Sequence, residues 1–222
     1  MDAIKPKKTL VEETYDILVD AICTSEFRPG ERLNQDEIAA RLKVSRQPVN
    51  SAIAILKSEK LVEDTGRRGV VVSALDPDLF RSIYEYRQLV EPFTVRFAID
   101  RKPADAARTA REVLDRGHHA VAEGDMRALL GADRDFHEMI YGWSGNLVVQ
   151  NSMRTNWNHI RRAMAEVLSD PAKAGPIWDE HEAIVNAMFA RQSDRAAELM
   201  TQHIRLAYDQ NPSPVFGVAE AS

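Results

Sequence analysis

Hydrophobic positions in the first 75 residues recur with helical spacing. Residues 11 to 22 place apolar side chains at i, i+4, i+7, i+8 and i+11, which is one face of an α-helix. Two shorter apolar faces follow, and the turn residues Arg28-Pro29-Gly30 separate them from the first. The second face comprises Ile38, Ala39 and Leu42, and the third comprises Val49, Ala52, Ile53 and Leu56. Two short helices joined by about three residues are typical of a helix-turn-helix.

The starts of these two helices carry capping signals. Asn34 precedes Glu37 by three residues, which predicts a capping-box-like start for the second helix. Ser45 is expected to cap the third helix, and Pro48 falls in its first turn, where a missing N–H costs nothing.

A basic hairpin is predicted after the third helix. Leu61-Val62 and Val70-Val71-Val72 have the composition of two short strands, and Thr65-Gly66-Arg67-Arg68-Gly69 lies between them. Two glycines permit a tight turn, and two arginines lie at its tip. Following a helix-turn-helix, such a hairpin indicates a wing. The alternative is an ordinary surface turn with incidental charge.

Beyond Asp76-Pro77 the chain shows only helical periodicity. A first helix has Phe80, Ile83, Arg87 and Val90 on one face, and Pro92 is expected to kink or end it. Further helices are predicted near 104–123, 126–143, 147–167, 177–190 and 194–208. The fold class is therefore mainly α: a winged helix-turn-helix over 1–75, an all-α antiparallel bundle over 76–210, and a tail over 211–222.

Four polar residues lie on apolar helical stripes of the second domain. Asp133 and His137 are four residues apart on one helix, so both point inward, and His181 and His203 lie on the stripes of two later helices. A buried unpaired carboxylate is costly, and one divalent ion would satisfy all four groups. Imidazole and carboxylate suit zinc, nickel or manganese. The alternative for each histidine is a hydrogen bond to the core backbone. His118, His119 and His159 are expected at the surface or rim.

Charge is distributed unevenly along the chain. Its 29 basic and 34 acidic residues give a net charge of −5, but residues 41–69 carry seven basic and three acidic side chains. Such a basic cluster favours a polyanionic partner. Cys23 is the only cysteine, which excludes an internal disulfide and a cysteine-based zinc motif. No apolar run approaches the length of a membrane span, and residues 1–8 contain no apolar signal core, so we expect a cytoplasmic protein.

Several motifs in fixed order make the first domain similar to the winged helix of GntR-family transcription regulators. They are Pro29-Gly30-Glu31-Arg32-Leu33, Glu37-Ile38-Ala39, Val44-Ser45-Arg46-Gln47-Pro48-Val49 and Leu61-Val62. The family usually has glycine where this chain has Lys43, and Arg-Glu where it has Asn50-Ser51. One helix-turn-helix reads only a few base pairs, so we expect a homodimer on a palindromic operator in double-stranded DNA. The expected DNA-contacting residues are Arg32, Ser45, Arg46, Gln47, Asn50, Arg67, Arg68 and Gly69.

The second domain resembles the FCD ligand-sensing domain that usually follows this winged helix. The matching motifs are Glu85-Tyr86-Arg87 with Glu91-Pro92, Asp133-Arg134-Asp135-Phe136-His137, Gly145-Asn146, Glu180-His181 and His203. In metal-binding members, the positions of Asp133, His137, His181 and His203 hold the ion. The resemblance also implies that Arg87 and Asn146 line the pocket of a small carboxylate effector. The alternative for Arg87 is a buried ion pair with a carboxylate such as Glu91.

These features together predict a metabolite-responsive transcription repressor that is not an enzyme. Two alternatives use the same Asp/His cluster. One is an all-α metalloenzyme in which the ion activates water. The other is a direct metal sensor, in which the ion itself is the signal. The sequence shows no general base beside the cluster, and the DNA-binding unit makes sensing the simpler role.

Overall fold

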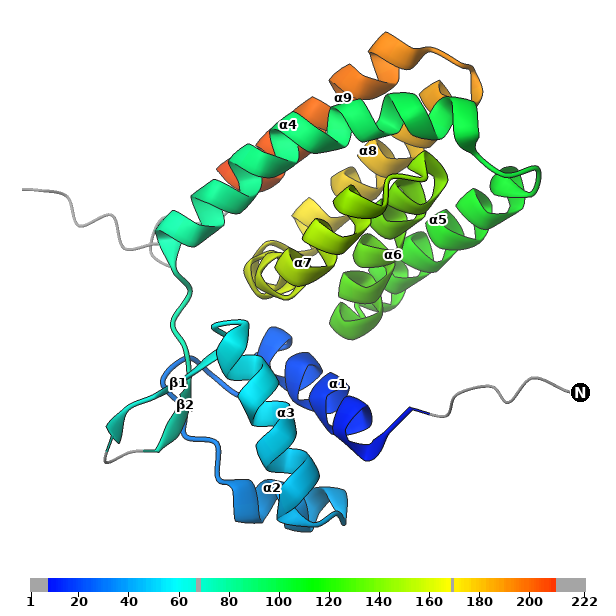
Figure 1. Cartoon of the computed structure of the whole chain (residues 1–222). Helices are drawn as coiled ribbons and strands as arrows, with labels where there is room; N and C mark the ends of the chain where they lie inside the picture. The colour runs from blue at the N-terminus through cyan, green and yellow to red at the C-terminus, as the bar shows by residue number, and fades with distance from the viewer. Residues whose placement is uncertain (1–7, 67–68, 169, 211–222) are drawn as a thin grey trace, which may run out of the picture. The chain divides into compact units, whose positions relative to one another are not determined.

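The computed structural model describes residues 8–66, 69–168 and 170–210, and the chain divides into two compact units, residues 1–74 and 75–222. The first unit contains α1 (Leu10–Cys23), α2 (Gln35–Leu42) and α3 (Arg46–Ser58), followed by β1 (Val62–Asp64) and β2 (Val70–Val72) (Figure 1). α1 packs across α3, and the predicted apolar faces form one core. That core includes Leu18, Ile22, Ile38, Val49, Ile53 and Leu56.

The turn between α2 and α3 is tight. Asn34 Oδ1 accepts hydrogen bonds from the backbone N–H groups of Asp36 and Glu37, as the capping signal predicts. Lys43 has a φ of 56°, the left-handed conformation that glycine adopts most easily. Ser45 occupies the N-cap position of α3 but makes no side-chain capping hydrogen bond, so the predicted cap is wrong in that detail. Its hydroxyl is therefore available for another partner.

The predicted hairpin is present. β1 and β2 pair antiparallel with Val62 opposite Val72, and Arg32 forms an isolated bridge with Val71. The turn is closed by the Thr65 N–H, which donates to the Gly69 carbonyl at 2.9 Å. Gly66 and Gly69 both have positive φ, which explains why glycine stands at each end of the turn. Arg67 and Arg68, the predicted tip of the wing, lie outside the described residues.

The second unit is a bundle of helices: α4 (Pro77–Arg101), α5 (Ala106–Glu123), α6 (Met126–Ser144), α7 (Leu147–Leu168), α8 (Pro171–Phe189) and α9 (Ser193–Asp209). The long α4 lies alongside α9 (Figure 1). α4 also packs on α6, α5 packs on α6 and α8, and α8 packs on α9. The core is formed by the inward faces of these helices and includes Tyr84, Phe136, Ile140, Trp157, Trp178 and Ile204.

Two helix boundaries differ from the prediction, one because of tertiary packing and one because of a local capping signal. α4 does not end at Pro92 but continues to Arg101. A proline inside a helix costs about 3 kcal/mol, and burial of the apolar face beyond it, including Val95 and Ile99, offsets that cost. α8 begins at Pro171 rather than near residue 177, because Asp170 caps it and a proline at the helix start needs no N–H.

None of the described helices is long and apolar enough to cross a bilayer.

Candidate functional site

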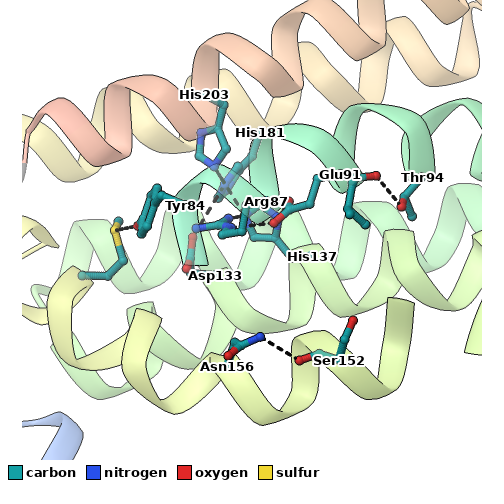
Figure 2. A network of polar contacts seen from close by, with 12 residues as sticks. Tyr84, Arg87, Glu91, Thr94, Asp133, His137, Ser152, Asn156, His181 and His203 are labelled. Carbon is teal, nitrogen blue, oxygen red and sulfur yellow. Dashed lines mark hydrogen bonds and ion pairs between the residues drawn. The ribbon is translucent and has the colours of Figure 1, made fainter. Parts of the chain in front are cut away.

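Three imidazole rings from three helices meet inside the bundle. His137 comes from α6, His181 from α8 and His203 from α9, and each is at most 3% exposed. Their Nε2 atoms converge: His203 Nε2 lies 3.2 Å from His181 Nε2 and 3.4 Å from His137 Nε2 (Figure 2). The ligand atoms of all three lie within 4.8 Å of one another. The helical stripes placed each ring inward, and packing brought the three together.

Two of these rings are oriented by carboxylates. Glu91 Oε2 lies 2.7 Å from His137 Nδ1, and Glu180 Oε2 lies 2.8 Å from His203 Nδ1. An ionised carboxylate only accepts hydrogen bonds, so both Nδ1 atoms must carry the proton. In a neutral imidazole this leaves the Nε2 atom with a bare lone pair. Metal-ligating histidines are oriented by their other ring nitrogen in the same way.

The Nε2 lone pairs of His137 and His203 therefore face each other without a proton between them. Each lies near a different donor: Arg87 Nη2 is 3.3 Å from His137 Nε2, and His181 Nε2 is 3.2 Å from His203 Nε2. His181 Nδ1 is buried and has no hydrogen-bond partner within the described part of the chain. Burial lowers the pKa of His137, although Glu91 opposes the shift, and burial together with the neighbouring His203 and His137 lowers the pKa of His181 well below its usual value. These shifts favour the neutral rings of His137 and His181, and the neutral form is the one that ligates metal.

Asp133 lies beside this cluster without joining its centre. It is 4% exposed, and its Oδ1 atom lies 3.7 Å from His181 Nε2. The group of ligand atoms within 4.8 Å of one another contains the three histidines and not Asp133. Asp133 is therefore near enough to complete a set of four ligands after a small side-chain movement.

Arg87 is held against both the cluster and a carboxylate. Its guanidinium is 2% exposed, Nε donates to Glu91 Oε1 at 2.5 Å, and Nη2 lies 3.3 Å from His137 Nε2. The ion pair with Glu91, one of the alternatives drawn from the sequence, is thus present. Burial alone would raise the pKa of Glu91, but Arg87 and His137 hold it well below its usual range. Glu91 therefore remains ionised and joins Arg87 to His137.

A further polar group near Arg87 lacks a partner. Trp157 Nε1 is buried and has no hydrogen-bond partner among the residues described. The Trp157 ring centre lies 5.6 Å from Arg87 Cζ and 5.3 Å from the His137 ring centre. The buried Tyr141 ring centre lies 6.3 Å from that of His137, and its hydroxyl interacts with Glu91. A buried donor without an acceptor costs about 1–3 kcal/mol, so an acceptor-rich ligand would relieve Trp157.

Asn146 has a structural role in the same unit. Its Oδ1 atom accepts hydrogen bonds from the backbone N–H groups of Val148 and Val149, and it caps the start of α7. Its predicted contact with an effector would have to come from the side-chain amide nitrogen. His118 and His119 are exposed and His159 is half-buried, as expected for residues outside the cluster.

The first unit presents polar residues at the start of α3. Ser45, Arg46, Gln47 and Asn50 are all exposed, whereas Pro48 and Val49 are buried. Arg46 Nε lies 3.0 Å from Asp36 Oδ1, and both side chains are more than 60% exposed. Arg32 is also exposed and runs beside Gly69: a Cβ atom on that glycine would lie 3.8 Å from Arg32 Nε. The helix start and the base of the hairpin thus both carry accessible donors.

Family comparisons match both units in the same order as the structure. The model of bacterial regulatory proteins of the gntR family matches residues 10–72, and the FCD domain model matches residues 82–206, more than half of the chain. The chain belongs to the GntR family of transcription regulators. It is a GntR regulator with a C-terminal FCD domain.

Individual relatives agree with this assignment. The Nta operon transcriptional regulator of Aminobacter aminovorans is 30% identical over 186 residues, covering 83% of this chain and 86% of that protein. The HTH-type transcriptional repressor GlaR of Escherichia coli (strain K12) is 25% identical, covering 86% of this chain and 90% of that protein. A crystal structure of a GntR regulator from Rhodococcus sp. RHA1 is 28% identical, with a TM-score of 0.76 over 90% of this chain and 96% of that one. This GntR regulator is therefore a DNA-binding regulator of transcription rather than an enzyme.

Sequence reasoning missed two residues that orient the cluster of this GntR regulator. Glu91 lies one helical turn after Arg87, so the spacing pointed to the ion pair but not to the second contact with His137 on α6. Glu180 reaches His203 from α8, across 23 residues of sequence, and no local pattern indicates that contact. Both depend on how the helices pack.

Proposed function

We propose that this regulator is a repressor whose affinity for its operator changes when a small carboxylate binds at a divalent metal ion in the C-terminal bundle. The observation that carries the proposal is the convergence of the Nε2 atoms of His137, His181 and His203, two of which carry a lone pair because a carboxylate accepts from Nδ1 of the same ring. A repressing role is supported by the relative GlaR, which is named a transcriptional repressor.

The donor set fits a divalent transition metal. Three neutral imidazoles with Asp133 as a fourth ligand suit zinc, nickel or manganese. Metals with a coordination number above four would keep positions open for an effector oxygen. An ion at this position would also satisfy the facing lone pairs of His137 and His203.

The groups around Arg87 favour an anionic effector. A guanidinium is always protonated and can grip a carboxylate through two parallel hydrogen bonds. Trp157 Nε1 is a buried donor without an acceptor among the described residues, and it lies close to Arg87 and His137. A carboxylate offers several acceptor sites, whereas a protonated amine offers none. In this proposal Asn146 contributes its amide nitrogen.

Metal content tests the first part of the proposal. Protein purified without a chelator or affinity-tag metal should contain close to one divalent ion per chain. His203→Ala should remove the ion and lower the thermal stability. His118→Ala changes a histidine whose side chain is 42% exposed and that pairs with Glu182, and it should change neither. If wild-type protein contains no ion and takes up none when a metal is added, the cluster is only a hydrogen-bonded core.

The response to effectors separates the proposal from a direct metal sensor. Operator binding should be measured with and without a chelator, and then with a panel of small carboxylates added to the metal-loaded protein. An organic acid that changes operator affinity at constant metal supports an effector role. A response to the ion alone, with no carboxylate effective, would identify a metal sensor instead.

On the DNA side, we propose a homodimer that reads a palindrome through the residues Ser45 to Asn50. Arg46 is paired with Asp36 at the surface, and such pairs contribute about 0–1 kcal/mol, so Arg46 can exchange that partner for DNA at little cost. Arg46→Ala should weaken operator binding by about 1–3 kcal/mol if the guanidinium contacts a base. Arg41→Ala, which removes an exposed arginine paired with Glu26, is the matched control.

The predicted wing makes a separate contribution. Arg67 and Arg68 are proposed to contact phosphates or to enter the minor groove. Replacing both with alanine should weaken binding to all sequences and reduce the salt slope by about one unit per lost contact. An unaltered salt slope would show that the hairpin does not contact DNA.

A further inference from the structure

The Arg87 side chain contacts two different partners, a carboxylate and an imidazole. Its Nε atom is held by Glu91 at 2.5 Å, while its terminal Nη2 lies 3.3 Å from Nε2 of His137 (Figure 2). The guanidinium is further packed against aromatic rings, 4.9 Å from the Tyr84 ring centre and 5.6 Å from that of Trp157. Arg87 is thus anchored at one end by a carboxylate and hydrogen-bonded at the other to a cluster histidine.

The direction of that second hydrogen bond is fixed by Glu91. Because His137 Nδ1 donates to the carboxylate, His137 Nε2 carries the lone pair and accepts from Arg87 Nη2. An imidazole nitrogen has a single lone pair in the ring plane. That same atom is one of the three that converge as candidate metal ligands. The guanidinium and an ion cannot share it.

We propose that the Arg87 guanidinium exchanges hydrogen-bond partners when a metal ion binds. It leaves His137 Nε2 when that atom ligates the ion, and its freed Nη2 then donates hydrogen bonds to the carboxylate effector. Glu91 keeps its contacts with Arg87 Nε and His137 Nδ1 throughout, so it holds the arginine beside the site and orients the histidine. This inference rests on the proposed metal and effector site and adds an order to it. Metal loads first, and loading prepares the arginine for the effector.

A purely structural ion pair would behave differently. If Arg87 only braced Glu91 and His137, removing it would loosen the ligands and leave metal affinity unchanged or weaker. If Arg87 competes for His137 Nε2, removing it must tighten metal binding. The guanidinium hydrogen bond is charge-assisted, and such bonds contribute about 1.5–3 kcal/mol, which corresponds to roughly a tenfold to hundredfold change. Tighter binding would exclude a purely bracing role.

The test compares Zn²⁺ affinities, measured by competition with a chromophoric chelator. Arg87→Met keeps the length of the side chain and removes the charge, and it should bind Zn²⁺ at least about tenfold more tightly than wild type. Arg81→Met removes an exposed arginine of the same helix, paired with Asp78, and should match wild type. Equal or weaker binding by Arg87→Met would overturn the exchange.

A second pair of variants separates competition from the negative charge of Glu91. Arg87→Met leaves Glu91 as an uncompensated anion, which would attract a cation by itself. We therefore compare R87M/E91Q with E91Q, where this anion is absent and glutamine can still accept from His137 Nδ1. Tightening in both pairs shows that Arg87 itself opposes the metal, as the exchange requires. Tightening only in the pair with Glu91 intact assigns the effect to the Glu91 anion and overturns the exchange.

A measurement on wild-type protein needs only one folded variant, R87M or Arg87→Lys, and uses it only to assign the Arg87 signals. In protein labelled with ¹⁵N-arginine, the Nη signal that is absent from R87M or from an Arg87→Lys variant should shift when Zn²⁺ is added, while the Nε signal held by Glu91 changes less. An unchanged Nη signal in protein that binds Zn²⁺ would overturn the exchange and leave the proposed metal site standing. Failure of wild type to bind Zn²⁺, Ni²⁺ or Mn²⁺ would overturn both.

Discussion

Replacing Glu91 with glutamine tests how much the buried network contributes to stability. The Glu91 carboxylate is fully buried and accepts from both Arg87 Nε and His137 Nδ1. Glutamine has the same shape but offers one acceptor oxygen and one donor NH₂ group. Because both partners donate, one of the two contacts becomes donor against donor. The substitution also leaves the Arg87 guanidinium, 2% exposed, without a counter-ion.

The expected loss is large compared with the stability of a typical domain. Breaking a buried ion pair by removing one partner costs about 3–5 kcal/mol, and domains are stable by only about 5–15 kcal/mol. With a urea slope of about 1–3 kcal/mol per molar for a small domain, the unfolding midpoint should fall by about 1 M or more. This expectation holds for protein stripped of metal, since bound ligand adds its own stabilisation.

The chain provides a local probe for this measurement. Its three tryptophans, Trp143, Trp157 and Trp178, all lie in the C-terminal unit. Tryptophan fluorescence during urea unfolding therefore reports on the unit that contains Glu91 and is insensitive to the winged helix. Circular dichroism, which detects the helices of both units, would show whether they unfold together.

Two comparisons make the result specific. Glu180→Gln removes a carboxylate that is 27% exposed and contacts His203, and it should cost about 0.5–1.5 kcal/mol. The double variant R87M/E91L removes both buried charges and should recover much of the loss, since apolar replacements of buried ion pairs are often neutral. The network does not stabilise the unit in this way if E91Q lowers the free energy of unfolding by less than about 1 kcal/mol, or if the double variant is no more stable than E91Q.

Two further predictions concern the same unit. Because burial lowers the pKa values of His137 and His181, the unfolded chain binds more protons below their usual pKa of 6.5. The free energy of unfolding of the metal-stripped protein should therefore be greatest above that pH and fall as the pH decreases from 7 to 5, by up to about 2.7 kcal/mol per pH unit for two protons; a flat profile would contradict the lowered pKa values. A Cβ atom on Gly117 would lie 2.2 Å from the Trp178 ring, so Gly117→Ala should destabilise by about 1–3 kcal/mol. Gly131→Ala, in a helix with open space around it, should be neutral or stabilising by up to about 1 kcal/mol, and equal effects of the two substitutions in a thermal melt would refute the packing argument.

Local periodicity in the sequence determined the architecture of both units. Helical spacing of apolar residues depends only on 3.6 residues per turn, so each stripe could be recognised without knowing its partner helix. The same rule placed His137, His181 and His203 inward before any contact between their helices was known. The family assignment also follows from the sequence, since its motifs have fixed spacing.

Only the tertiary structure decided how the inward groups meet. The shared contacts of Glu91 and the contact of Glu180 with His203 join side chains on different helices, and helix packing rather than spacing sets them. The same holds for the continuation of α4 through Pro92, because the apolar contacts that offset the proline come from neighbouring helices. Which atom of His137 faces Arg87 depends on all these contacts together. The sequence thus specifies which side chains are buried, and the packing specifies which of them share a proton, a lone pair or a charge.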